Sequence, residues 1–288
     1  MFHILRHSAG ALCVALIAGF TIPPAFGADL GGKNVEPMPD IGPWSFAFTT
    51  YGWIPWISGD MTIRERSFDV QADPAAILGH LDWDTIPAWM SYAEARNGPI
   101  GLFNDIIYAN VSNSRDFQKE LPGNLPPLAG GVSTDYQLVI VEFGGAYELW
   151  SGMNSAVGAP AAFDLVAGGR YWHQGVTAAA ALDRFDTVRS GSIDWVDPFV
   201  GGRLRQQLGQ NDSLVVSADA GGFGAGSNAS WQVRATYNWQ LPVMCNLLLD
   251  GYIGYRALSV DYSQGSGDTL FKQDVLIQGP VMGTTLHF

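Results

Sequence analysis

In the stretch DYQLVIVEFGGAYEL, residues 135–149, apolar side chains largely alternate with polar or very small ones. In an extended strand, Val141 and Phe143 fall on one face, while Glu142 and Glu148 fall on the other among glycine and alanine. A soluble β-sandwich has the same period of two. Here the polar face consists of small residues and charges, which suits the crowded, wet interior of a membrane barrel. The stretch therefore predicts an all-β, closed antiparallel transmembrane β-barrel, with a sandwich as the alternative.

The same alternation recurs along the chain between turn signals. An even number of strands fits a single-chain barrel with both termini in the periplasm. Ten strands are the alternative to twelve, because Asp105 falls in phase with Phe103 and Ile107 and breaks the alternation of its segment. We expect about twelve strands, at 44–57, 60–71, 85–97, 99–112, 134–149, 162–174, 176–188, 194–208, 212–224, 229–240, 246–258 and 269–288.

Aromatic residues mark the strand ends. Membrane barrels carry girdles of Trp and Tyr where their strands meet the two membrane surfaces. The predicted girdle residues are Trp44, Trp56, Trp150, Trp195 and Trp239.

The chain ends on the strand GPVMGTTLHF, residues 279–288. Its alternation predicts that Met282, Thr284, Leu286 and Phe288 face lipid, and that Gly283, Thr285 and His287 point inward. This strand must pair with the first one, since an open sheet edge is not tolerated in lipid. A terminal aromatic such as Phe288 resembles the assembly signal of outer-membrane barrels, so the barrel assembly machinery is a predicted partner.

The N-terminus predicts export. Arg6 and His7 precede an apolar run, two prolines end it, and Ala25 and Gly27 stand where a signal peptidase cuts. We therefore predict a signal peptide over 1–27, a periplasmic lead-in over 28–43 and a barrel over 44–288. No later stretch of 18 uncharged apolar residues predicts a membrane-spanning helix.

The composition fits export to the outer membrane. Charged residues make up 15% of the chain, which also contains 35 Gly, 10 Trp, 10 Tyr and 15 Phe. The formal net charge of −12 argues against nucleic-acid binding. Cys245 is the one cysteine after the predicted signal, so we expect no intrachain disulfide, no metal site and no cofactor. Outer-membrane lipid and lipopolysaccharide are the expected surroundings, and the sequence marks no oligomer interface.

Several motifs also resemble a known family. They are YGWIPWISGD (51–60), DPAAILGHLD (73–82), GLFNDIIY (101–108), DPFVGGRLR (197–205), GGFGAGSNASWQ (221–232) and the closing GPVMGTTLHF. In this order they resemble the porin-like outer-membrane β-barrels of Gram-negative bacteria. The resemblance implies the fold and the outer-membrane location, and it carries over no catalytic residue.

One short helix is predicted near 73–83, with Asp73 as its N-cap and Pro74 in its first position. Counting strands from the N-terminus places this helix and the connection over 112–133 at the periplasmic end. Periplasmic turns are normally short. Either the strand parity is wrong in the first half, or these segments partly plug the lumen. A surface helix packed on the rim of the barrel is a further alternative.

The predicted interior is charged, and all of its basic residues are arginine, whose planar fork holds carboxylates and anionic ligands. One hypothesis is a narrow porin-like channel whose arginines pass or bind small anionic solutes. The alternative is a non-conducting barrel for envelope structure or surface interaction, closed by a salt-bridge network and the helix. The candidate lumen residues are Arg96, Arg170, Arg203, Arg205, Arg234, Arg256, Glu142, Asp197, Asp219 and Asp250, with Glu94 and Glu148 on the same face.

An enzyme is not expected. Hydrolytic barrels need a nucleophile and a base within hydrogen-bond reach. The strand pattern places no Ser–Asn pair beside His173 or His287.

Overall fold

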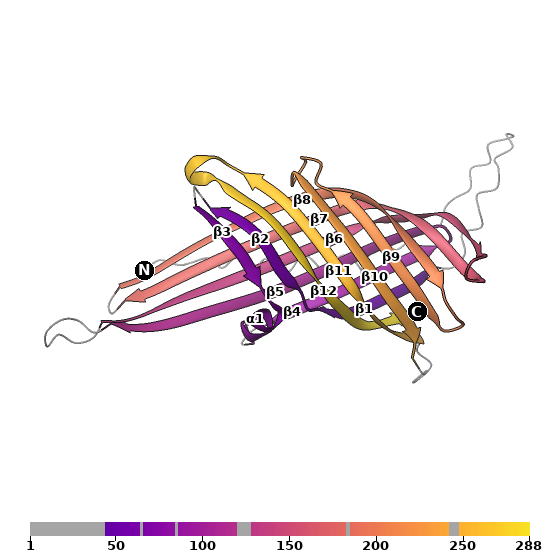
Figure 1. The fold of residues 1–288 in the computed structure, drawn as a ribbon, viewed down its shortest axis with the longest axis horizontal. Coiled ribbons are helices and arrows are strands. Elements are labelled where there is room, and N and C mark those ends of the chain that lie inside the picture. Colours follow the sequence, from indigo (N-terminus) through magenta and orange to yellow (C-terminus); the bar gives the residue numbers. More distant parts are fainter. Residues whose placement is uncertain (1–43, 64–65, 84–85, 120–127, 183–184, 242–247) are drawn as a thin grey trace, which may run out of the picture. The chain divides into compact units, whose positions relative to one another are not determined.

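The computed structural model describes residues 44–63, 66–83, 86–119, 128–182, 185–241 and 248–288, so the predicted signal peptide and lead-in lie outside the described residues. These residues form one antiparallel sheet of twelve strands that closes on itself as a ring (Figure 1). The predicted closed, all-β barrel of about twelve strands is confirmed. The strands are β1 Ser45–Trp53, β2 Trp56–Ile63, β3 Arg66–Ala72, β4 Ala88–Asn97, β5 Ile100–Lys119, β6 Leu128–Asn154, β7 Ala159–Leu182, β8 Phe185–Gln207, β9 Asp212–Gly221, β10 Ala229–Gln240, β11 Leu248–Gln264 and β12 Phe271–His287.

Two pairs of strands each share one position in the ring. β1 and β2 both pair with β12 in one continuous register, and they are separated only at Pro55, which has no N–H to donate. On the other edge of this β1–β2 line, β3 pairs with β2 and β4 pairs with β1. The twelve strands therefore occupy ten positions around the ring, which reconciles the two predicted counts.

This arrangement corrects the predicted strand parity. β3 and β4 run in the same direction, so the connection between β5 and β6 lies at the end of the ring opposite the C-terminus. Of the two alternatives for this span, the first holds: the strand count from the N-terminus had the wrong parity in the first half, and most of 112–133 belongs to β5 and β6. Likewise, the three strands predicted between 162 and 208 are two long ones, β7 and β8. We call the end that holds the C-terminus the C-terminal end and the opposite one the far end.

The seam forms as predicted. β12 pairs with β1 from Ala47–His287 to Trp53–Val281, and the last residue continues the ladder, since Phe288 N–H donates to Phe46 C=O at 2.9 Å. Together with β1–β4 pairing, this closes the ring without an edge around its C-terminal half.

The outer face carries a belt of apolar side chains. These residues alternate with the interior ones and are about half exposed; they include Phe46, Phe48, Trp56, Leu102, Phe143, Tyr147, Leu149, Phe163, Leu165, Val196, Val200, Trp231, Val233, Ile253, Tyr255 and Met282. Trp44, Trp56 and Trp150 are exposed, consistent with girdles. Trp195 is not a girdle residue: it is buried inside, because it shares the phase of Asp197 and Arg203.

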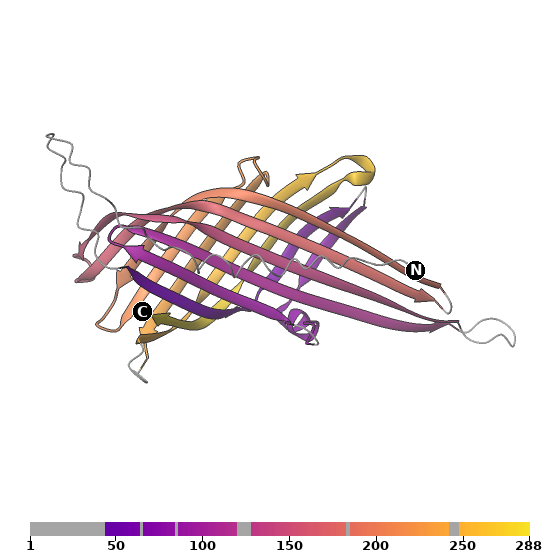
Figure 2. The ribbon, with the colours of Figure 1, turned by 180° about the vertical axis from the view of Figure 1, so that it is seen from behind.

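The predicted helix is present and shorter than expected. α1 runs over Pro74–Gly79, and Asp73 caps it by accepting a hydrogen bond from Ala76 N–H at 2.7 Å. α1 follows β3, and the residues after it lie against β5, through a bridge between Leu81 and Val111 (Figure 2). The helix is therefore beside the wall, midway along β5, and not at the end of the barrel where the strand count from the N-terminus had placed it. No helix in the described ranges is long and apolar enough to cross a membrane.

Candidate functional site: the interior of the barrel

The interior is built in layers, and β7 shows their order. From the C-terminal end, its inward side chains are Asp164, Arg170, Trp172 and Val176. They belong to a first charge cluster, a second charge cluster, an apolar layer and a cavity, in that order. The order of these layers along the barrel axis determines whether a solute can pass.

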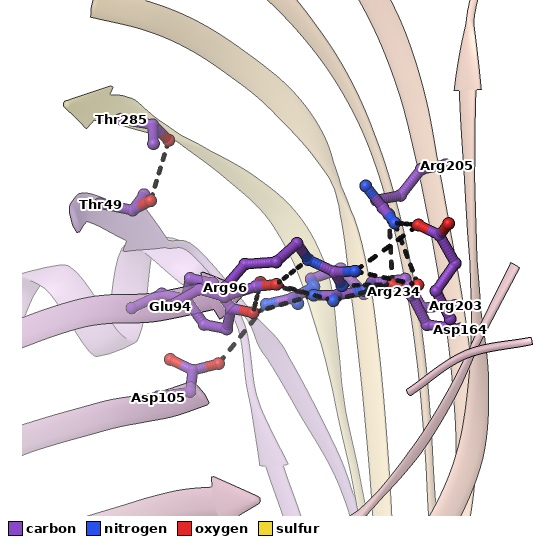
Figure 3. A network of polar contacts seen from close by, with 11 residues as sticks. Thr49, Glu94, Arg96, Asp105, Asp164, Arg203, Arg205, Arg234 and Thr285 are labelled. Atoms are coloured by element: carbon purple, nitrogen blue, oxygen red, sulfur yellow. Dashed lines mark hydrogen bonds and ion pairs between the residues drawn. The ribbon is translucent and has the colours of Figure 1, made fainter. Parts of the chain in front are cut away.

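The first layer, here called the terminal cluster, consists of Glu94, Arg96, Glu148, Asp164, Arg203 and Arg205. Figure 3 labels all of these residues except Glu148. Arg203 holds Glu94 bidentately, with nitrogen–oxygen distances of 2.7 and 2.9 Å. The fully buried Asp164 accepts from Arg96 and Arg203, each at 2.9 Å. Arg205 reaches Asp164 at 3.0 Å and Glu148 at 2.8 Å. Since β4, β6, β7 and β8 all contribute, the cluster bridges the lumen from wall to wall.

The second layer, the central cluster, consists of Asp105, Glu142, Arg170, Asp219, Arg234 and Arg256. Arg170 donates to Glu142 and to Asp219, both at 2.8 Å. Arg256 donates to Glu142 at 2.8 Å and to Asp105 at 2.9 Å. Both guanidinium groups have 0% exposed side chains. Burial of a charge is tolerated where it is paired and hydrogen-bonded, as here.

Neutral groups complete the central cluster. Tyr51 OH donates to Asp105 at 2.5 Å and accepts from Arg256 at 3.0 Å. Gln232 accepts from Arg256 at 2.7 Å and donates to Glu142 at 3.3 Å. Tyr51 and Gln232 thus occupy hydrogen-bonding groups of the central cluster that would otherwise be available to a solute.

Three predicted lumen residues are less tightly held. Arg234 lies 3.5 Å from Asp105 and stacks over the ring of Tyr92 at 5.3 Å. Asp250 pairs with His287 at 2.9 Å near the C-terminal end. Asp197 makes no ion pair among the described residues; it accepts from the backbone N–H of Ser227 at 2.6 Å, and so anchors the β9–β10 loop. Its role is thus local and structural.

The third layer is apolar. It consists of Trp53, Ile107, Ile140, Trp172, Trp195, Leu258, Val260, Tyr262, Val275, Ile277 and Val281. Trp195 stacks on Trp172 with centroids 5.4 Å apart and on Tyr262 at 4.1 Å. Ile107 explains the broken alternation of β5: it faces inward with Asp105, and so does Phe103, which stacks near Tyr92. The sequence pattern had suggested an interior that is polar throughout. The structure instead has an apolar layer in the middle of it.

Cavities lie on either side of these layers. One of about 1000 Å³ occupies the far end, and one of about 230 Å³ lies toward the C-terminal end, lined by Arg205, Arg234, Asp250 and His287 among others. Between the charge clusters there is a void of about 30 Å³, which holds roughly one water molecule. The central cluster and the apolar layer separate the far-end cavity from the one toward the C-terminal end.

All ten candidate residues lie on the inner face, and the structure brings nine of them into ion pairs with acids or arginines there or with His287. Arg205 and Glu142 are examples; Asp197 is the exception described above, and Asp250 pairs with histidine. The prediction missed Asp105 and Asp164, two of the most buried acids. The phase of Asp164 with Arg170 is the signal that finds it, whereas Asp105 was hidden by apolar neighbours of the same phase.

The two clusters are balanced electrically. Each contains three arginines and three acids. Among the described residues there is no group of three or more His, Cys, Asp or Glu that is arranged to hold a metal ion. The arrangement is able to cross-link the barrel wall from inside, and its arginines are already occupied by carboxylates of the chain.

No family model and no curated protein matches the chain in sequence. In fold, the chain is similar to the outer membrane protease OmpT from Escherichia coli, with a TM-score of 0.50 and 9% identity over 87% of this chain and 97% of that one. It is also similar to the translocator domain of the autotransporter NalP from Neisseria meningitidis, with a TM-score of 0.36 and 10% identity over 87% and 90% of the two chains. A FadL homologue from Pseudomonas aeruginosa matches with a TM-score of 0.28 and 8% identity over 85% and 90%. The OmpT match shows a shared outer-membrane β-barrel fold alone.

Proposed function

We propose that the chain is a non-conducting outer-membrane barrel, which acts in envelope structure or in surface interaction at its far end. The main observation in support is that Arg170 and Arg256 are fully buried and paired with carboxylates of the chain. The channel hypothesis requires these arginines to contact the solute. A pore selective for anions requires hydrated, accessible charge along its length.

The apolar layer supports the same proposal. Trp172, Ile140 and Leu258 are each 0% exposed, so no water contacts them in the middle of the interior. An anion crossing this layer would lose its hydration without gaining a hydrogen bond. Passage would need the aromatic stack to separate.

The outer-membrane placement rests on the belt, on the predicted signal peptide and on the porin-like resemblance of the motifs. The short turns at the C-terminal end and the long β6–β8 strands that project at the far end support a periplasmic C-terminus (Figure 1). Lipid and lipopolysaccharide then surround the wall. The expected absence of catalytic activity stays a prediction.

The test is planar-bilayer conductance of the refolded mature chain, across a salt gradient. We expect no discrete steps from protein whose barrel is shown intact by its heat-dependent mobility on a gel. Steps with anion selectivity that weaken in Arg234→Ala would overturn the proposal in favour of the channel. Steps with cation selectivity would overturn it as well, and would leave the arginines no part in selectivity.

Placement is tested separately by labelling intact cells with a membrane-impermeant maleimide, in a Cys245→Ser background. Val188→Cys, at an exposed outward position of β8 at the far end, is expected to react. Asn211→Cys, in the turn between β8 and β9 at the C-terminal end, serves as the matched control and is expected to react only after lysis. The reverse pattern would show that the proposed orientation is wrong.

A further inference from the structure

The far-end cavity has the size and lining of a ligand site. Its volume of about 1000 Å³ is at the upper end of the range that small-molecule pockets span. The apolar layer forms its floor, because Ile193 and Phe271 line the cavity and also pack on that layer. The apolar part of the lining is contributed by Met61, Ile63, Phe68, Val176, Ile193 and Phe271.

Two arginines line the same cavity. Arg66 comes from β3 and Arg189 from β8, and both are exposed. They differ from the six arginines of the two clusters, because neither makes an ion pair or a side-chain hydrogen bond with any described residue. One acid, Asp268, also lines the cavity, so the described lining carries a net positive charge. Free guanidinium groups above an apolar floor are complementary to an anionic head group on an apolar body.

The wall beside the cavity is discontinuous. β3 pairs with β2 alone, and the far end of β5, beyond Asn113, pairs with β6 alone, within the described part of the chain. β3 and β5 accordingly diverge toward the left in Figure 1. The outward side chains of β3, which borders the gap, are Ser67, Asp69 and Gln71, so the gap lies beyond the apolar belt. There water satisfies the unpaired edges, which lipid would not.

We propose that the far-end cavity binds an acidic amphiphile, a single apolar chain that ends in a carboxylate, and that the gap between β3 and β5 admits it from the side. The Arg66 and Arg189 guanidinium groups hold the head group, and the chain lies along Phe68, Val176 and Ile193. The proposal relies on the far end facing outward, as proposed above, and it does not depend on whether the barrel conducts.

The test is equilibrium binding of laurate to the full mature chain in lipid nanodiscs, with empty nanodiscs subtracted. Dodecanol and dodecyltrimethylammonium are the matched neutral and cationic probes. Laurate is expected to bind saturably and most tightly. In Arg66→Gln/Arg189→Gln we expect its affinity to fall by roughly tenfold or more, because two charge-assisted hydrogen-bond donors are lost.

Matched controls come from the other face of the wall. Lys272→Gln removes a cation at the same end, but Lys272 points outward from β12 and is expected to leave laurate binding unchanged. Ala178→Trp fills the cavity and should abolish binding, whereas Thr177→Trp, one residue away and outward, should not. Equal binding of the three probes, or full laurate affinity in the double arginine variant, would overturn the proposal. These results are independent of conductance, so they separate this inference from the proposed function.

Discussion

Glu142→Gln is expected to destabilise the barrel by about 3–5 kcal/mol, because two buried arginines share this one carboxylate. Glu142 Oε1 accepts from Arg170 Nε and from Arg256 Nη2, both at 2.8 Å. Glutamine keeps the shape but removes the charge. Each guanidinium then stays in a dry interior with a single carboxylate within 3.0 Å, Asp219 for Arg170 and Asp105 for Arg256.

Glu148→Gln is the matched control. Glu148 belongs to the terminal cluster and pairs with Arg205 at 2.8 Å, but their side chains are 24% and 34% exposed. Water replaces much of what the substitution removes, so the expected cost is about 0–1 kcal/mol. The measurement is urea unfolding of both variants in phospholipid vesicles, followed by tryptophan fluorescence under conditions where refolding is reversible.

Equal free energies of unfolding for the two variants would refute the reasoning, because they would mean that the central cluster is as hydrated as the terminal one. A double-mutant cycle with Arg170→Gln adds a second criterion, since a shared ion pair must give a non-additive cost. Glu142→Gln is also expected to stay silent in the bilayer, because the apolar layer above it is unchanged.

Three further predictions concern packing, backbone contact and assembly. Trp172→Ala should cost about 3–5 kcal/mol in the same unfolding assay, since it leaves a cavity in the apolar layer; Trp44→Ala, on the exposed outer face, should cost much less. Gly168→Ala should prevent normal pairing of β6 with β7, because its Cβ would lie 2.1 Å from a backbone carbonyl oxygen, whereas Gly145→Ala meets nothing closer than 3.7 Å; gel mobility after refolding compares the two, and equal yields would contradict the close approach. Deletion of Phe288 should lower the amount of barrel in the outer membrane of cells without changing refolding into vesicles; equal losses in both assays would indicate a structural role of Phe288 and not an assembly signal.

The sequence pattern was sufficient for the inner and outer faces of most strands. Glu142 and Phe143 lie on opposite faces as predicted, because the period of two in a strand is fixed by backbone geometry. The pattern does not say what an inward face is made of. Ile107 and Trp195 face inward among aromatic and aliphatic neighbours. A prediction that assumes a wet lumen places both side chains on the wrong face of the wall.

Contacts across the ring were beyond the sequence. Arg203 and Glu94 are 109 positions apart, and their bidentate pair exists only because β4 and β8 face each other across the interior. The sequence also did not show that β1 and β2 share one position in the ring, and that β3 and β4 share another. Pro55 and the insertion after Ala72 look like the ends of ordinary, separate strands. Pattern identifies the strands, whereas the three-dimensional ring determines which charges meet.

β3 and β4 follow each other in the chain and share one position in the ring, but they do not pair with each other. The covalent connection between them is therefore not needed for any strand pairing. Between Ala72 and His80 the backbone leaves the sheet to form α1, while each of the two strands keeps its partners in other parts of the chain. A break or an inserted peptide within α1 thus removes no strand pair, and lengthening a loop costs only about 0.6 kcal/mol for each doubling. This is the place where the protein can acquire new surface sequence, or be reassembled from two fragments, with its wall intact.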